Sequence, residues 1–323
     1  MNEMKPIVMI CDKNFVQYTC VALMSLKINK RKETKYDIYV ILVDCSKESA
    51  ELVKSLEDKD FIINIINREA INNTKIEQVA HVSQAALIKF NLCDMITQYD
   101  KILYLDGDLI IKDDLSELFD IDLEDNYLAC AIHSIAIITN RPKLNSGVML
   151  LNATKIRNEK LSRVFVKTRE DLGSRSSMDQ ETFHIVFNNK LVRLNPKYNV
   201  MVDKISYEKK FYSIKDYNKY FGTSFNKRSE IIDNASILHY TGAIKPWKYS
   251  FAPCAKQWQY YYKKMYGEKS LSNLKLKSYT TYLKEKIHKE GIRAIYRLSK
   301  DKCLEFIGDH FEIYLDKNFE EWK

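Results

Sequence analysis

Short apolar segments alternate with longer amphipathic segments over the first 200 residues of the chain. The apolar segments are rich in β-branched residues, which is typical of buried strands, and they cover residues 7–11, 36–44, 61–66, 101–105 and 127–132. Between them, apolar residues recur three and four positions apart, as in helices, at residues 15–27, 47–58 and 84–97. The repeated order of strand, helix and strand predicts an α/β fold with a mainly parallel sheet flanked by helices.

Carboxylates follow two of the predicted strands. Asp12 comes after the first strand, and Asp106 and Asp108 come after the fourth, in KILYLDGDLI. Ligands of such a sheet bind beyond the carboxyl ends of its strands, and a carboxylate there is costly to desolvate unless a positive group meets it. Two carboxylates at this spacing can turn toward one point, and their oxygens suit Mg²⁺ or Mn²⁺. Some phosphatases share the spacing, but they usually continue with Gly-Thr where this chain has Leu109 and Ile110.

Two further polar clusters lie in the middle of the chain. NSGVMLLN, residues 145–152, is a polar turn that leads into a strand. SSMDQETFHIVF, residues 176–187, is typical of a capped helix start with Asp179 and Gln180 in its first turn. A carboxylate at that place is stabilised by the helix dipole even without a function.

A fourth cluster, ILHYTGAIKPW at residues 237–247, is more unusual. Its predicted strand presents His239, and a glycine turn and Lys245 follow. An imidazole, a close backbone N–H and a fixed cation are the groups that a metal-bound pyrophosphate requires. A lone histidine is nevertheless more often a structural residue than a metal ligand.

Composition and charge restrict the possible partners and location of the protein. The chain has 323 residues and a net charge of +8, which favours anionic partners without choosing among them. Residues 263–302 carry 12 basic and 4 acidic side chains, so the basic character is concentrated near the end of the chain. Seven cysteines, none in a C-x-x-C pair, are expected to be reduced core residues. With no apolar run long enough for a membrane span or a signal peptide, we expect a cytoplasmic protein.

The four clusters together resemble glycosyltransferase family 8, a family of retaining enzymes. The resemblance rests on the order and spacing of IVMICDKNF, KILYLDGDLII, LNSGVMLLN, MDQETFHIVF, NPKYNV and LHYTGAIKPW, which span about residues 5–260. It implies a GT-A fold, a UDP-sugar donor and Mn²⁺, with Mg²⁺ as an alternative. It also implies a catalytic domain at residues 1–261. Residues 262–323 lie outside the resemblance, and their charge and apolar spacing predict a basic, largely helical extension.

Site residues are carried over from the resemblance position by position. Asp106, Asp108 and His239 match metal ligands. The residues that match UDP contacts are Cys11, Asp12, Asn14, Phe15, Gly107, Gly242 and Lys245, and those that match donor-sugar contacts are Lys89, Asn145, Asp179 and Gln180. Asp179 and Gln180 are also the expected catalytic residues. Lys89 stands where many bacterial relatives have Arg, and His133 stands where they often carry an acidic residue near the acceptor.

The resemblance implies transfer of glucose or galactose from a UDP-sugar to a glycan, with retention. The amide of Gln180 is a poor nucleophile, which favours attack from the face that the leaving phosphate occupies. Two alternatives remain: a sugar-nucleotide-binding protein with a decayed site, and a metal-dependent phosphatase. No nucleic-acid partner is expected. In residues 281–300, Leu283, Ile287, Ala294, Ile295 and Leu298 form an apolar stripe among basic residues, so this segment either packs on the domain or docks on an anionic membrane.

Overall fold

The computed structural model describes residues 4–69, 84–172, 178–208 and 211–290. Its strands are β1 Lys5–Asp12, β2 Tyr36–Val43, β3 Phe61–Arg68, β4 Lys101–Leu105, β5 Leu109–Ile111, β6 Leu128–Ile132, β7 Leu144–Asn152, β8 Leu191–Arg193, β9 Val200–Met201 and β10 Ile237–His239. The α-helices are α1 Val16–Asn29, α2 Lys47–Lys54, α3 Gln84–Lys89, α4 Leu92–Met95, α5 Ile135–Thr139, α6 Ala153–Asn158, α7 Leu161–Leu172, α8 Met178–Phe187, α9 Val202–Tyr207, α10 Ile214–Phe221, α11 Arg228–Asp233, α12 Ala255–Tyr266 and α13 Tyr279–Glu290. Three 3₁₀ helices are η1 Ser116–Asp120, η3 Pro196–Asn199 and η5 Glu268–Asn273.

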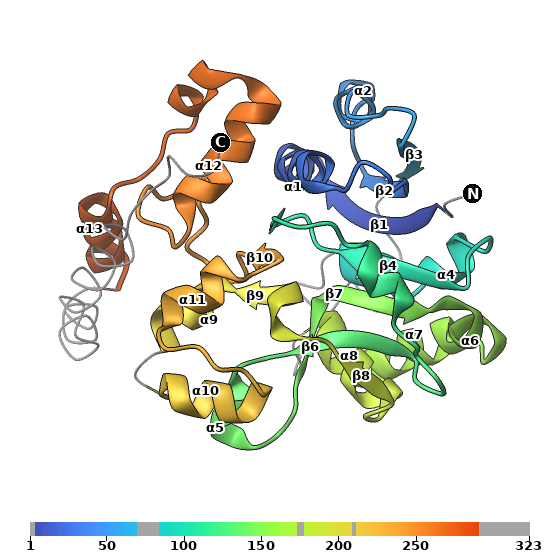
Figure 1. The fold of residues 1–323 in the computed structure, drawn as a ribbon. Helices are drawn as coiled ribbons and strands as arrows, with labels where there is room; N and C mark the ends of the chain where they lie inside the picture. The colour runs from blue at the N-terminus through green and yellow to red at the C-terminus, as the bar shows by residue number, and fades with distance from the viewer. Residues whose placement is uncertain (1–3, 70–83, 173–177, 209–210, 291–323) are drawn as a thin grey trace.

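The central sheet has seven strands in the order β3-β2-β1-β4-β7-β6-β8. Its first four strands are mutually parallel, and β7 runs antiparallel to both of its neighbours. This mainly parallel sheet, with helices above and below it (Figure 1), confirms the predicted α/β class.

Alternation along the strands separates two apolar cores. Ile7 and Met9 of β1 face α1, whereas Val8 and Ile10 face the side covered by α3, α4, α7 and α8. Successive side chains of a strand point to opposite faces. Both faces are therefore buried, which explains why the parallel strands are almost continuously apolar.

A second, three-stranded sheet lies beside the first, with the order β5-β10-β9. A third apolar core surrounds it and draws on α9, α11, α12 and the loop after β10. This small sheet places β10 next to the segment that leaves β4, because Leu109 of β5 pairs with His239.

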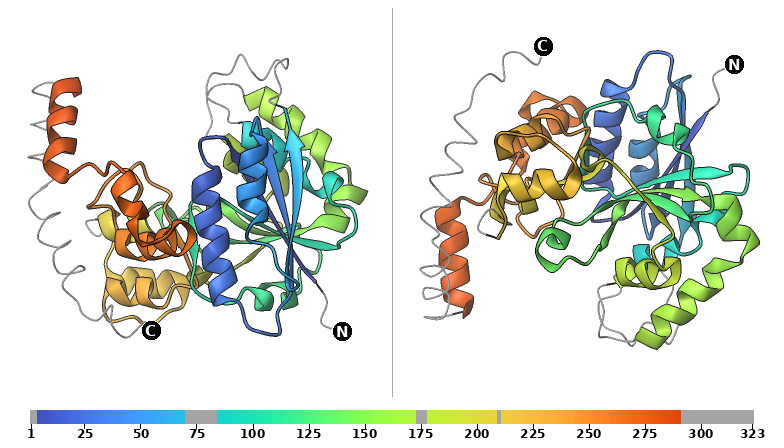
Figure 2. Two further views of the ribbon diagram at one scale, coloured as in Figure 1. Left: turned by 90° about the horizontal axis from the view of Figure 1, so that it is seen from above. Right: turned by 60° about the horizontal axis from the view of Figure 1, so that its bottom comes forward.

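The described part of the chain ends with helices α12 and α13. Helix α12 runs through residue 261, where the sequence analysis ends the catalytic domain, and its buried side chains face α1 and the loop after β10. Helix α13 lies at the edge of the molecule in both views of Figure 2. Its Tyr282 ring contacts the rings of Tyr249 and Phe251. Part of the apolar stripe expected in residues 281–300 falls beyond residue 290 and lies outside the described residues.

Among the described residues, none of the helices is both long and apolar enough to cross a bilayer. The six cysteines in this part of the chain form no disulfide, and five of them are buried. Cys303 lies outside the described residues.

Candidate metal and donor-sugar site

Three potential metal ligands from distant parts of the chain meet at the carboxyl end of β4. His239 Nε2 lies 3.2 Å from Asp108 Oδ1 and 3.8 Å from Asp106 Oδ2. One ligand atom from each residue lies within 4.8 Å of the other two. Two carboxylate oxygens suit Mg²⁺ or Mn²⁺, and one imidazole nitrogen beside them is a ligand that transition-metal ions accept. The chemistry of this cluster therefore fits one divalent ion.

Gly147 is required for these groups to approach one another. Its carbonyl accepts the backbone N–H of Asp106 at 2.8 Å, because β7 pairs with β4. A Cβ atom at position 147 would lie 2.3 Å from His239 Cε1 and 2.8 Å from Asp106 Oδ2. Any side chain there would displace two of the three potential ligands.

Lys89 joins the metal cluster to the predicted sugar-binding residues. Its Nζ lies 3.0 Å from Asp106 Oδ1 and 2.7 Å from Asp179 Oδ2, and its side chain is 7% exposed. Burial alone would lower the pKa of Lys89, but the two carboxylates outweigh burial and raise it well above its ordinary value. Ser146 Oγ also donates to Asp179 at 3.0 Å. Lys89 is therefore a buried cation shared by two acidic side chains.

Lys245 contacts the cluster through Asp108. Its Nζ is 2.7 Å from Asp108 Oδ2, and it also donates to the carbonyl of Tyr240. Burial would raise the pKa of Asp108, yet His239 and Lys245 together hold that pKa well below its usual range. Asp108 is thus held as a carboxylate, the form that binds metal.

The two predicted amides are in contact. Asn145 Nδ2 donates to Gln180 Oε1 at 3.4 Å, and Asn145 Oδ1 accepts from the backbone N–H of Gly147 at 3.1 Å. Asn145 lies in β7 and Gln180 in the first turn of α8. The strand and the helix therefore bring the donor-sugar candidates to one side of the metal cluster.

Four of the residues that match UDP contacts lie at the end of β1 or in the turn that leads to α1, namely Cys11, Asp12, Asn14 and Phe15. Asp12 Oδ1 accepts the backbone N–H groups of Asn14 at 2.8 Å and Phe15 at 3.0 Å, so its carboxylate closes the turn. Cys11 is buried, and Phe15 packs edge-on against Trp247 with ring centroids 5.7 Å apart. This turn also borders the metal cluster, because a Cβ at Gly107 would lie 3.2 Å from Phe15 Cδ1.

His133 and Gly242 lie near Asp203, an acidic residue that was not predicted to belong to the site. A Cβ at Gly242 would approach the Asp203 side chain to 3.0 Å, which explains the glycine by close packing. His133 Nδ1 accepts the backbone N–H of Ile135 at 3.0 Å. Burial and the charge of Lys204 lower the pKa of His133 to about 4, so its imidazole is neutral near pH 7.

Sequence reasoning missed four residues that support the cluster. Asn199 Oδ1 lies 2.8 Å from His239 Nδ1, and Tyr104 OH donates to Asp106 Oδ1 at 2.7 Å. Ser146 contacts Asp179, and Asp203 accepts from Thr241. Asn199 lies within the NPKYNV motif, but nothing local in that motif indicates which side chain it contacts.

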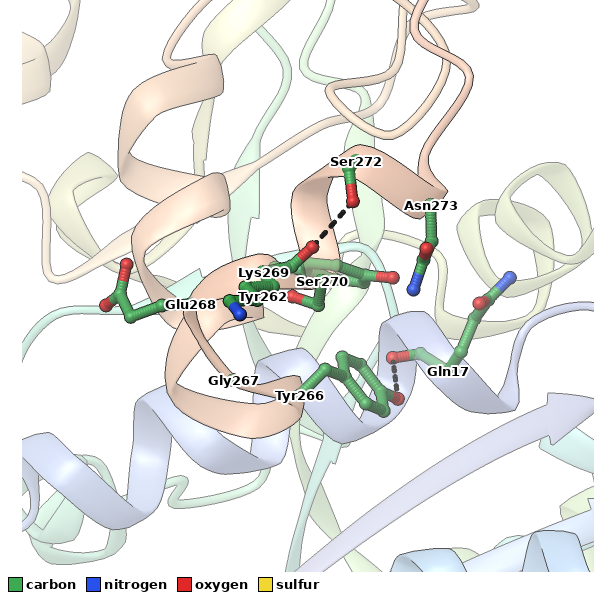
Figure 3. A pocket seen from close by; sticks show the side chains of 9 residues that line it. All are labelled: Gln17, Tyr262, Tyr266, Gly267, Glu268, Lys269, Ser270, Ser272 and Asn273. Carbon is green, nitrogen blue, oxygen red and sulfur yellow. Dashed lines mark hydrogen bonds between the residues drawn. The ribbon is translucent and has the colours of Figure 1, made fainter.

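A cavity of about 670 Å³ lies elsewhere, between the start of α1 and the turn from α12 to η5 (Figure 3). Residues that line it include Gln17, Tyr262 and Tyr266, and the Tyr266 hydroxyl donates to the Gln17 carbonyl at 2.9 Å. None of the predicted site residues lines this cavity. It therefore has no part in the candidate site.

Known proteins resemble this chain in sequence. A lipopolysaccharide 1,2-glucosyltransferase of Escherichia coli is 26% identical over 255 residues, which cover 73% of this chain and 71% of that protein. Glycosyltransferase GlyE of Streptococcus pneumoniae serotype 4 is 28% identical over 176 residues, which cover 53% of this chain and 39% of GlyE. This chain thus spans about two fifths of the length of GlyE.

The fold has a close counterpart among solved structures. The galactosyltransferase LgtC, solved in complex with donor and acceptor sugar analogues, superposes with a TM-score of 0.64 at 22% identity, covering 80% of this chain and 95% of LgtC. This likeness confirms the predicted GT-A fold. Residues 6–250 match the family model described as glycosyl transferase family 8, which is most of the chain. The chain therefore belongs to glycosyl transferase family 8.

Proposed function

We propose that this protein is a retaining, metal-dependent hexosyltransferase that moves glucose or galactose from a UDP-sugar to a hydroxyl group of a glycan. The observation that carries the proposal is the convergence of Asp106, Asp108 and His239 at the carboxyl end of the central sheet. Ligands of open α/β sheets bind at that edge. Family membership and the glucosyl- and galactosyltransferase relatives support the choice of hexose.

In this proposal Asp106, Asp108 and His239 hold Mn²⁺ or Mg²⁺, which supplies a Lewis acid for the diphosphate leaving group. Lys245 adds a positive charge next to the proposed ion, since its Nζ is 2.7 Å from Asp108. A diphosphate bound at the cluster would therefore lie within reach of Lys245. One charge pair about 4 Å apart contributes roughly 4 kcal/mol at an effective dielectric constant near 20. If that interaction forms only in the transition state, it accelerates transfer roughly several hundredfold.

The donor sugar would lie against Lys89, Asn145, Asp179 and Gln180. Asp179 already accepts from Lys89 and Ser146, and its pKa is lowered despite burial, mainly by Lys89. A carboxylate bound in this way orients a sugar hydroxyl better than it attacks a carbon. Gln180 is an amide, which is a weak nucleophile. We therefore favour same-face attack, with the departing phosphate oxygen taking the proton of the acceptor hydroxyl.

His133 would contact the acceptor. Since its Nδ1 accepts from the Ile135 N–H, the neutral ring carries its proton on Nε2. His133 therefore offers a hydrogen-bond donor to an acceptor oxygen. It does not offer the free base that an acidic residue would supply.

The uracil and ribose would lie over the turn after β1. Because the Asp12 carboxylate is bound to backbone N–H groups and Cys11 is buried, we propose that contact comes from the exposed Asn14, the Phe15 ring and the backbone. Gly107 and Gly242 then border the diphosphate. In this proposal, residues 1–261 form the catalytic domain and residues 262–323 form its extension. The protein would act in the cytoplasm.

The test is hydrolysis of UDP-glucose and UDP-galactose with and without Mn²⁺. The proposal expects Mn²⁺-dependent release of UDP by the wild type and loss of that release in His239→Ala. The matched control is His288→Ala, on the exposed side of α13, which should act like the wild type. UDP binding without turnover would favour the decayed-site alternative. Release of phosphate from simple phosphomonoesters would favour the phosphatase.

A further inference from the structure

A chain of buried side-chain amides leads from the backbone of Gly147 to the imidazole of His239. Asn145 and Asn199 are its two links. Asn199 is 2% exposed, His239 3% and Asn145 7%, so these side chains have little access to water. Each buried donor or acceptor must therefore find its partner in the neighbouring group.

The backbone fixes the orientation of the first amide. The N–H of Gly147 points at Asn145 at 3.1 Å, and a backbone N–H can only donate. The Asn145 atom that faces it is therefore the carbonyl oxygen, Oδ1. The reversed amide would place two donors against each other.

That orientation determines the second amide. Asn199 approaches the same Asn145 Oδ1 at 2.7 Å, so the Asn199 atom there must be the donor Nδ2. The other end of the Asn199 amide, Oδ1, then faces His239 Nδ1 at 2.8 Å. An amide oxygen only accepts, so Nδ1 of His239 carries a proton.

Because Nδ1 keeps its proton, Nε2 is the ring nitrogen that can give its lone pair to an ion. His239 Nε2 faces Asp108 Oδ1 at 3.2 Å and Asp106 Oδ2 at 3.8 Å. We infer that Asn199 is a positioning residue for the metal site, which holds His239 in the Nδ1–H tautomer with the Nε2 lone pair directed at the ion. The inference rests on the proposed metal-dependent function and adds a residue to it.

The small sheet explains how Asn199 reaches this place. Asn195 accepts the N–H of Lys197 and starts the 3₁₀ turn that ends at Asn199. The next residue, Val200, pairs with Leu238, the neighbour of His239. The register of β9 on β10 therefore fixes the backbone of Asn199 beside the imidazole.

The first test needs no variant of Asn199. In ¹⁵N-histidine-labelled, metal-free protein, the His239 signals can be assigned among the six histidines by comparison with His239→Gln. We expect a proton on Nδ1 of His239. An unprotonated Nδ1 would overturn the inference.

The second test measures Mn²⁺ affinity, from the electron paramagnetic resonance signal of free Mn²⁺. Asn199→Leu should bind Mn²⁺ about 10- to 100-fold more weakly, the usual effect of losing the partner of a metal-bound histidine. Asn29→Leu is the matched control. Asn29 is a half-buried amide that donates to Ile111 O and Tyr261 OH, away from the cluster, and its loss should leave Mn²⁺ affinity unchanged.

If Asn199→Leu does not fold, variants at Asn145 test the same relay, which is the row of hydrogen bonds from Gly147 through Asn145 and Asn199 to His239. Asn145→Asp keeps the oxygen that accepts from Gly147 and Asn199, so it should bind Mn²⁺ no more weakly than the wild type. Asn145→Leu removes that oxygen and should bind more weakly. Equal Mn²⁺ affinity in wild type and a folded Asn199→Leu, or in the two Asn145 variants, would overturn the relay but leave the proposed function intact. Absence of Mn²⁺ binding by the wild type would overturn both.

Discussion

Gly147 is the residue where the demands of the fold and of the proposed metal site coincide. We predict that Gly147→Ala lowers stability by about 1–3 kcal/mol, as overpacking does, because the new Cβ would meet His239 and Asp106. It should also weaken Mn²⁺ binding, since both neighbours are proposed ligands. Thermal unfolding and Mn²⁺ titration measure the two effects.

Gly222 provides the control for that variant. Its φ of +67° strains any other residue, but a Cβ there meets nothing within 4 Å. Gly222→Ala should therefore lower stability by about 1 kcal/mol through the backbone alone and leave Mn²⁺ affinity unchanged. If Gly147→Ala bound Mn²⁺ as tightly as Gly222→Ala, the account of the crowded cluster would be wrong.

Asp114 is a buried carboxylate that stabilises the fold through hydrogen bonds. It accepts from the backbone N–H groups of Arg31 and Ser116, both at 2.9 Å, and from Tyr36 OH at 3.1 Å. Burial alone would raise the pKa of Asp114, but the hydrogen bonds from Ser116 and Arg31 lower it below its ordinary value. A carboxyl group whose pKa is depressed on folding contributes stability above its unfolded pKa, near 3.9, and loses it as the pH falls through the folded pKa.

We therefore predict that Asp114→Asn is less stable than the wild type at pH 7 and that the difference narrows as the pH falls below about 4. Urea unfolding at a series of pH values measures it. Asp122→Asn, at an exposed turn, should show little difference at any pH. If the difference in unfolding free energy between the wild type and Asp114→Asn stayed constant down to acid pH, the assigned role of the carboxylate would be wrong.

At the scale of elements, the apolar segments of the sequence correctly predicted β1, β2, β3, β4 and β6, because each of these strands is buried over several residues. Sequence periodicity failed where pairing is long-range. Residues 145–152 were predicted as a polar turn that leads into a strand, yet Asn145 and Ser146 already lie inside β7, where they are buried against partners from distant segments. The single helix expected over 84–97 is divided into α3 and α4.

The small sheet was only partly predicted for a similar reason. Its strands have two or three residues, too few to show any periodicity. The ordered motifs identified most of the groups that gather near His239, because those residues carry distinctive chemistry. Asn199 and Asp203 were not predicted as site residues because their hydrogen-bond partners lie about 40 residues away in the sequence.

Helix α12 supports the loop that carries Lys245. The ring of Trp258 in α12 lies 5.5 Å from Trp247, which stacks on Tyr18 at 4.2 Å. Trp258→Ala should cost about 3–5 kcal/mol of stability, and it should also weaken UDP binding because the Lys245 loop loses its support. Calorimetric titration with UDP and Mn²⁺ would measure the second effect.

Phe61→Ala is the matched variant for this comparison. Phe61 is fully buried in β3, on the far edge of the central sheet, so its truncation should lower stability to a similar extent and leave UDP affinity unchanged. Equal UDP affinity in the two variants would show that α12 does not support the donor site.

At the scale of the whole molecule, charge is distributed unevenly, with 12 basic and 4 acidic side chains in residues 263–302. The contacts of Tyr282 with Tyr249 and Phe251 show that α13 packs on the domain through one side. We propose that the basic side chains of this region also bind an anionic membrane, where each cation contributes about 1 kcal/mol. Such binding would suit a lipid-linked glycan acceptor.

The charge-reversal pair Lys284→Glu and Lys286→Glu tests this on an intact chain. It should weaken binding to vesicles rich in anionic lipid by roughly tenfold or more and leave UDP-sugar hydrolysis unchanged. The control pair is Lys32→Glu and Lys59→Glu, two exposed lysines outside the basic region. Equal vesicle binding by the two pairs, or no binding by the wild type, would leave domain packing as the role of α13.

The central claim is that Asp106, Asp108 and His239 together bind one divalent ion that holds the diphosphate of UDP. A crystal structure with Mn²⁺ and UDP tests it most directly, because the anomalous signal of Mn²⁺ locates the ion. We predict one Mn²⁺ bound by all three side chains and in contact with the diphosphate, with Lys245 beside it. Mn²⁺ bound away from any of the three, or UDP bound at another place on the molecule, would contradict the account.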